Sequence, residues 1–89
     1  MKTYRKIHIL FAGEEPAMSY SDEKLAQTVL ERCEEWQEEA SAIYFDWMCD
    51  QITTREHYDK EKAHKNAHPL HPSYANAQDY ALKTVFLHE

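Results

Sequence analysis

The sequence is poor in the residues that build several easily recognised sites. It contains a single glycine, Gly13, together with three prolines and two cysteines among 89 residues. One glycine cannot form the glycine-rich loop that cradles phosphate groups, so the sequence excludes a phosphate-loop nucleotide site. No apolar run reaches the roughly 18 residues that a membrane-spanning helix needs. We therefore expect neither a phosphate cradle nor a membrane-embedded segment.

The two cysteines are too far apart to form a disulfide framework. Cys33 and Cys49 lie sixteen residues apart on one predicted helix, which separates them by more than four turns. Reduced thiols are typical of cytosolic proteins, and no secretory signal pattern opens the chain. These features predict a cytoplasmic protein without a membrane partner.

Positive charge is scarce in the middle of the chain. The formal net charge is −6, and from Glu14 to Asp50 eleven acidic residues are offset only by Lys24 and Arg32. Nucleic acids and anionic lipids both require a basic surface, so direct binding to either is not expected. A basic protein surface is the partner that this charge distribution favours.

The longest regular pattern runs from Ser21 to about Asp50 and contains no glycine or proline. Its apolar residues recur at helical spacing, which predicts one long amphipathic helix with Ser21 as the N-cap. The apolar stripe consists of Leu25, Val29, Cys33, Trp36, Ala40, Ile43 and Trp47. The opposite side carries Glu31, Glu34, Glu35, Glu38 and Glu39. Residues 43–49 also alternate as a strand would, but the absence of a turn residue before them favours the helix.

The remaining segments predict a small α+β single domain, residues 1–89. Thr3–Ala12 is typical of a strand that ends at Gly13, and residues 13–21, with Pro16, are expected to form a loop. Thr53 and Glu56 have capping-box spacing, which predicts a second helix at 54–66 with little buried surface. A His/Pro loop follows, and residues 79–88 favour a strand that pairs with the first, with a short helix as the alternative.

Four histidines lie close together in the second half of the chain. His64 and His68 have the i, i+4 spacing that can place two imidazoles on one metal ion, and His57, Glu61 or His71 could supply a third ligand. Pro69 disfavours helical backbone at His68. A site for zinc or another divalent transition metal at His64, His68 and His71 is therefore an alternative interpretation, while a solvated loop without any cofactor is preferred.

The aromatic residues of the long helix are interpreted as core or as a self-interface. This group comprises Trp36, Ile43, Tyr44, Phe45 and Trp47. A chain of this length has little area with which to cover two indoles, and each uncovered indole forfeits hydrophobic stabilisation. Pairing of two copies would recover that stabilisation, so we expect a homodimer or another homo-oligomer.

No pair of residues shows the spacing of a catalytic site, so the chain is not expected to be an enzyme. The preferred hypothesis is a small acidic interaction protein, an inhibitor or regulator, that engages a basic surface through its glutamate side. A more specific version of this hypothesis is that the carboxylate row imitates DNA phosphates. In composition alone the chain is similar to small acidic inhibitors of viral or mobile-element type, and no motif carries this similarity. A metal-binding module that uses the histidines and a structural subunit of a larger assembly are the two competing hypotheses.

Overall fold

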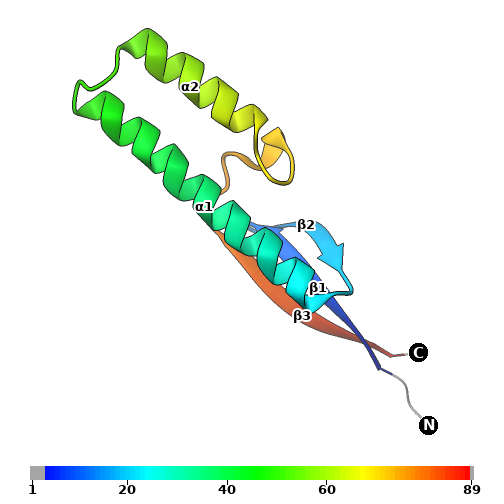
Figure 1. Ribbon diagram of the computed structural model, residues 1–89. Coiled ribbons are helices and arrows are strands. Elements are labelled where there is room, and N and C mark those ends of the chain that lie inside the picture. The colour runs from blue at the N-terminus through cyan, green and yellow to red at the C-terminus, as the bar shows by residue number, and fades with distance from the viewer. Residues whose placement is uncertain (1–3, 89) are drawn as a thin grey trace. The chain divides into compact units, whose positions relative to one another are not determined.

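The computed structural model describes residues 4–88, and the chain divides into two compact units. The first unit contains residues 4–32 and 77–88, and the second is Cys33–Asn76. The elements follow the order β1, β2, α1, α2, a short 3₁₀ helix η1, and β3 (Figure 1). The predicted α+β class is confirmed. Thr3, where the first strand was predicted to begin, lies outside the described residues.

The first unit is built on a three-stranded antiparallel sheet. β1 (Tyr4–Ala12) is the central strand, with β2 (Glu15–Tyr20) on one side and β3 (Tyr80–His88) on the other. β1 and β3 pair without a register shift from Tyr4↔His88 to Ala12↔Tyr80. The predicted pairing of the first and last strands is therefore confirmed, and Tyr80–His88 form a strand rather than a helix.

β2 corrects the prediction of a loop at residues 13–21. Gly13 adopts φ 64°, the left-handed conformation that glycine accepts at little cost, and turns the chain directly from β1 into β2. Pro16 lies opposite Phe11, beside a register shift between Leu10 and Phe11. Since β2 is an edge strand and the ladder is irregular at this point, the missing N–H of Pro16 is tolerated.

One face of this sheet is buried. His8, Leu10 and Ala12 alternate along β1 and are almost fully covered, whereas Ile7, Ile9 and Phe11 on the other face are half-buried. The N-terminal part of α1, which belongs to the same unit, also contributes a fully buried residue, Ala26. His8 is satisfied in this position because its Nδ1 lies 3.0 Å from Thr84 Oγ1 on β3.

α1 (Glu23–Met48) is a single helix of 26 residues, as the sequence predicts, and residues 43–48 are helical. Its N-cap is Asp22 rather than Ser21: Asp22 Oδ1 accepts hydrogen bonds from the N–H groups of Lys24 and Leu25 at 2.9 and 3.3 Å. A carboxylate there also complements the positive end of the helix dipole. At the other end Asp50 adopts φ 59°, and Gln51 N donates to Asp46 O at 2.8 Å in a Schellman-type ending.

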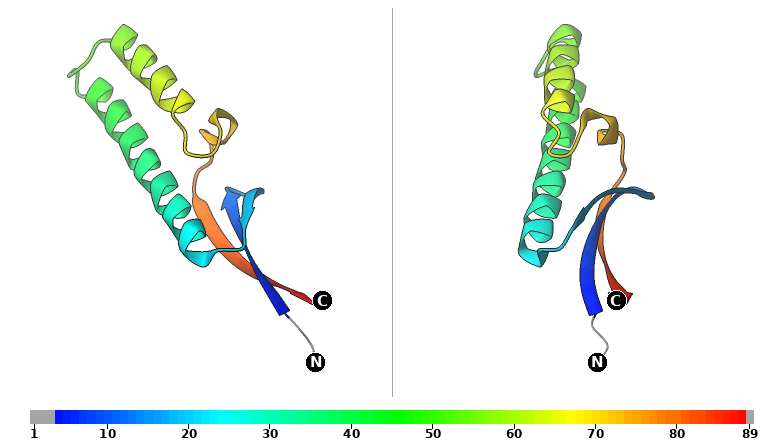
Figure 2. Two further views of the ribbon diagram at one scale, coloured as in Figure 1. Left: turned by 45° about the vertical axis from the view of Figure 1, so that its right-hand side comes forward. Right: turned by 90° about the vertical axis from the view of Figure 1, so that its right-hand side faces the viewer.

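The second unit contains a helical hairpin. From Cys33 onward α1 runs beside α2 (Thr54–Asn66) in the opposite direction, as Figures 1 and 2 show. Thr53 and Glu56 form the predicted capping box, and α2 has no buried residue, which confirms that it is mostly exposed. The His/Pro segment continues into η1 (Pro72–Tyr74). Within the described residues, no helix combines the length and apolar character that crossing a membrane requires.

Candidate partner-binding face

The glutamates predicted to bind a partner are all exposed on α1. Glu31 belongs to the first unit, whereas Glu34, Glu35, Glu38 and Glu39 belong to the second. At 100° per residue these four project into one half of the helix circumference, with Glu34 and Glu38 opposite the buried Trp36 and Glu39 at the border nearest to it. We call Glu34, Glu35, Glu38 and Glu39 the acidic face.

The acidic face has almost no neutralising charge. Six acidic residues and no Lys or Arg occur between Cys33 and Asp50. Among the described residues, Glu39 is the one member of the acidic face with an ion-pair contact, 3.8 Å from its carboxylate to His64 Nδ1. Like charges at i, i+4, such as Glu34 and Glu38, cost a few tenths of a kcal/mol in an isolated helix. Within α1 these carboxylates therefore meet no cation, and the Lys and Arg residues of the same unit lie on α2, at Arg55, Lys60, Lys62 and Lys65.

An exposed aromatic residue stands on the same side of the helix. Phe45 is 66% exposed, and its helical position falls between those of Glu34 and Glu38, two to three turns further along α1. Met48, 59% exposed, lies next to it at i+3. Phe45 was grouped with the core or self-interface residues in the sequence interpretation. The structure leaves it uncovered by its own unit and brings it together with the acidic face.

The other aromatic residues pack toward α2. Trp36 is 8% exposed, Ile43 and Trp47 are half-buried, and Tyr44 is 54% exposed. Tyr44 nevertheless makes edge contacts with Trp47 and His57, at centroid distances of 5.9 and 6.2 Å. Trp36 is thus buried within the second unit, whereas Ile43 and Trp47 are only half-buried. Residues of the second unit already cover Trp36. The burial of this indole therefore no longer requires a second copy of the helix.

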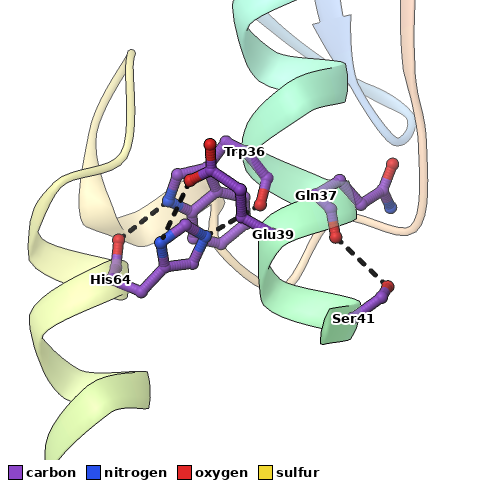
Figure 3. A network of polar contacts seen from close by, with 5 residues as sticks. All are labelled: Trp36, Gln37, Glu39, Ser41 and His64. Carbon is purple, nitrogen blue, oxygen red and sulfur yellow. Dashed lines mark hydrogen bonds and ion pairs between the residues drawn. The ribbon is translucent and has the colours of Figure 1, made fainter. Parts of the chain in front are cut away.

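Trp36 and His64 form a reciprocal contact that joins α1 to α2. Figure 3 shows their side chains between the two helices. Trp36 Nε1–H donates to the His64 carbonyl at 2.8 Å, and His64 Nε2 lies 2.8 Å from the Trp36 carbonyl. A carbonyl only accepts, so Nε2 carries the proton. The two rings are stacked, with centroids 4.5 Å apart and planes 6° apart.

A second stack repeats this arrangement nearer the hairpin turn. Trp47 and His57 have ring centroids 4.5 Å apart and an interplanar angle of 15°. His57 Nε2 contacts Glu61 at 2.9 Å, while His57 Nδ1 is buried without a hydrogen-bond partner among the described residues. Helical spacing placed Trp36 and Trp47 on one side of α1, but the sequence reasoning did not find their imidazole partners. Two indole–imidazole stacks therefore fix the acidic half of α1 against α2.

The histidines proposed as metal ligands are engaged elsewhere. His64 uses both ring nitrogens, as described above. His68 Nδ1 accepts hydrogen bonds from the N–H groups of Leu70 and His71, and His71 Nδ1 contacts Ser73. His68 touches Trp36 edge-on at 4.5 Å. Over residues 4–88, no three His, Cys, Asp or Glu side chains gather as metal ligands, so the structure does not bring His64, His68 and His71 together as a site.

A cavity of about 250 Å³ opens between the two helices of the hairpin. Its lining combines apolar residues, including Trp36, Ile43 and Tyr44, with the polar residues His57, Glu61 and His64. Trp36, His57 and His64 are the same residues that hold the hairpin together by stacking and hydrogen bonding. The cavity is therefore a gap in the hairpin packing, and we assign it no ligand.

Burial shifts two pKa values in the second unit. The pKa of the Cys33 thiol rises from 9.0 to about 11, mainly because of burial and secondarily because of Glu34. The pKa of His68 falls below its ordinary value of 6.5, first because of burial and then because of His64 and His71. Cys33 is therefore an unreactive thiol and His68 favours its neutral form.

Comparisons with protein-family models, with curated proteins and with solved structures found no match to this chain.

Proposed function

We propose that this chain is a non-catalytic protein-interaction module that inhibits or regulates a partner by binding a basic protein surface through the acidic face. The observation that carries the proposal is the combination of uncompensated carboxylates with an exposed Phe45 on one side of one helix. The partner that fits has a Lys/Arg-rich surface with an apolar pocket for Phe45.

The charge supports both attraction and selectivity. A row of unscreened carboxylates accelerates encounter with a basic surface and repels acidic competitors. The carboxylates of Glu34, Glu35 and Glu38 form no ion pair with the described part of the chain. When a partner's lysines and arginines bind these carboxylates, they therefore displace only water. The cost of breaking internal ion pairs is therefore small.

Phe45 adds an apolar anchor. Burial of a phenylalanine side chain contributes about 1.5–3 kcal/mol, and protein interfaces concentrate their affinity in a few such residues. The stack of Trp47 on His57 lies two residues from Phe45 and holds this end of α1 in the hairpin. Little conformational entropy is then lost when a partner binds.

Affinity capture with matched charge variants tests the proposal. The face variant carries Gln at Glu34, Glu35 and Glu38. The control variant carries Gln at Glu14 and Glu15 and Asn at Asp59, so it loses the same number of charges at exposed positions elsewhere. We expect a basic protein from the source cell to bind the native chain and the control in equal amounts, and to be lost from the face variant and from Phe45→Ala.

Capture of the same proteins by all four chains would contradict the proposal. So would a protein that the control variant loses and the face variant retains, because that result places the contact outside the acidic face. Circular dichroism of each variant confirms that the helix content is unchanged.

A further inference from the structure

β3 leaves one whole edge of the sheet open. The strand order β2-β1-β3 places β3 at the border, and within residues 4–88 no strand pairs with its outer side. The N–H of Gly13 donates to the Asp79 carbonyl at 2.8 Å, which fixes the alternation of the β1–β3 ladder. Asp79, Ala81, Lys83 and Val85 therefore direct their backbone N–H and C=O groups toward β1. The N–H and C=O groups of the alternate residues, Leu82, Thr84 and Phe86, point away from β1. They form a row of donors and acceptors along the open edge.

This edge has few of the features that normally block strand pairing. From Tyr80 to Leu87 the strand contains no proline, and its pairing with β1 shows no bulge. Lys83 is the single charged residue in that stretch. Val85, Phe86 and Leu87 are 38, 59 and 44% exposed. Exposed apolar edges of this kind pair readily with another strand.

We propose that β3 pairs antiparallel with β3 of a second copy of the chain, about a two-fold axis at Thr84. Thr84 is the middle residue of Tyr80–His88, so this centre pairs the strand along its full length. Any other centre leaves residues unpaired at the ends. The result is a continuous sheet of two three-stranded halves, with an isologous interface.

The side chains fit this register. Leu82 lies opposite the partner's Phe86, Thr84 opposite its own copy, and Lys83 opposite the partner's Val85. Threonine pairs and apolar pairs across strands are both favourable. A centre at Lys83 would instead oppose two lysines, which is unfavourable.

The charge distribution selects a second copy at this edge and not at the long helix. Two acidic faces repel each other, since no Lys or Arg occurs between Cys33 and Asp50. Ala81–Leu87 carries the single charge of Lys83, and the two-fold axis places that charge opposite an apolar residue. Self-association through β3 therefore needs no compensation of charge, and it uses no residue of the acidic face.

Two opposite substitutions at one position test the pairing. Val85→Lys places a lysine opposite Lys83 twice in each dimer, and we expect about five- to thirty-fold weaker dimerisation by sedimentation equilibrium. Val85→Glu places a carboxylate there and should strengthen dimerisation. The double variant Lys83→Glu, Val85→Lys restores opposite charges and should recover the affinity lost in Val85→Lys.

Cysteine cross-linking tests the register without depending on these energies. In a Cys49→Ser background, the double variant Lys83→Cys, Val85→Cys places two non-hydrogen-bonded cross-strand pairs within disulfide reach. We expect rapid oxidation to a covalent dimer, whereas Ala81→Cys, Lys83→Cys should react slowly because those positions are out of register. A chain that is monomeric at every concentration overturns the proposal. A dimer with equal affinity for Val85→Lys and Val85→Glu, or with equal cross-linking of both cysteine pairs, overturns it as well.

Discussion

Cys33 and Cys49 differ in burial although both lie at the same helix. Cys33 is fully buried, and burial followed by Glu34 raises its pKa to about 11, whereas Cys49 is exposed. Since the thiolate is the reactive form, Cys33 should be protected both by burial and by its low ionisation.

We expect the folded chain to react rapidly with one equivalent of a thiol reagent at about pH 8, and with a second equivalent only after unfolding. A chromogenic disulfide reagent measures both steps. Cys49→Ser should abolish the rapid step. Two thiols of equal rate in the folded chain would mean that Cys33 is not enclosed.

We expect His68 to make the second unit sensitive to acid. It is 7% exposed, and its Nδ1 accepts two backbone hydrogen bonds that protonation would remove. Burial, and then His64 and His71, hold its pKa below 6.5, so the unfolded chain binds more protons in that range. The stabilisation is complete above about pH 6.5 and decreases as the pH falls toward the lowered folded value.

Urea unfolding from about pH 8 to about pH 5 should show this loss of free energy of unfolding. His68→Asn keeps an acceptor for the Leu70 N–H but does not titrate, so its stability should depend less steeply on pH. His71→Asn, at an exposed cap position, removes the last of the three causes that lower the His68 pKa, so its slope should lie between those of the native chain and His68→Asn. Equal slopes for His68→Asn and the native chain would remove His68 as the cause.

At the scale of elements, the Trp36–His64 contact holds α1 against α2. Trp36→Phe removes the indole N–H that the His64 carbonyl accepts at 2.8 Å in a part-buried site. We expect a loss of about 1–3 kcal/mol in the free energy of unfolding, measured by circular dichroism in urea. Trp47→Phe is the comparison, because its N–H contacts Thr54 at 3.3 Å in an exposed position and should cost less than about 1 kcal/mol. Equal losses would show that the two stacks are equivalent.

Elements governed by local sequence could be predicted well. The period of α1 and the Thr53–Glu56 capping box of α2 are local signals, and the structure contains both helices close to their predicted bounds. Two predictions were wrong, the N-cap of α1 and the loop at residues 13–21, because two local structures were possible at each position. Ser21 and Asp22 are both good caps, and Asp22 is the one whose side chain reaches the helix N–H groups. Pro16 favours a loop until pairing with β1 makes it part of an edge strand.

The candidate site was predictable only in part. Helical geometry places Glu34, Glu35 and Glu38 on the side away from Trp36, and their exposure follows from that geometry alone. The exposure of Phe45 depends on which side α2 covers, which is a tertiary property. The reciprocal bonds of Trp36 and His64 join residues 28 positions apart and have no local signal. Of the histidines in the metal hypothesis, His64 is occupied by this distant contact, whereas His68 and His71 are occupied by groups only two or three residues away.

At the scale of the whole molecule, charge is segregated between the parts of the chain. Between Cys33 and Asp50 every charged residue is acidic, whereas β1 and β3 contribute Arg5, Lys6 and Lys83. Lys6 and Lys83 lie over the rings of Phe86 and Phe11, at 5.8 and 5.0 Å from Nζ to the centroid. The molecule thus offers two surfaces of different chemistry, and we propose a basic protein as the partner of one and a second copy as the partner of the other.

The most direct measurement is the salt dependence of affinity for the captured basic partner, determined by titration calorimetry with three chains. We expect the native affinity to fall steeply with salt, and the variant with Gln at Glu34, Glu35 and Glu38 to bind more weakly with a shallower salt dependence. Phe45→Ala should lose about ten-fold or more in affinity while keeping the native salt dependence. If the three chains bound with the same affinity and the same salt dependence, binding through the acidic face would be contradicted.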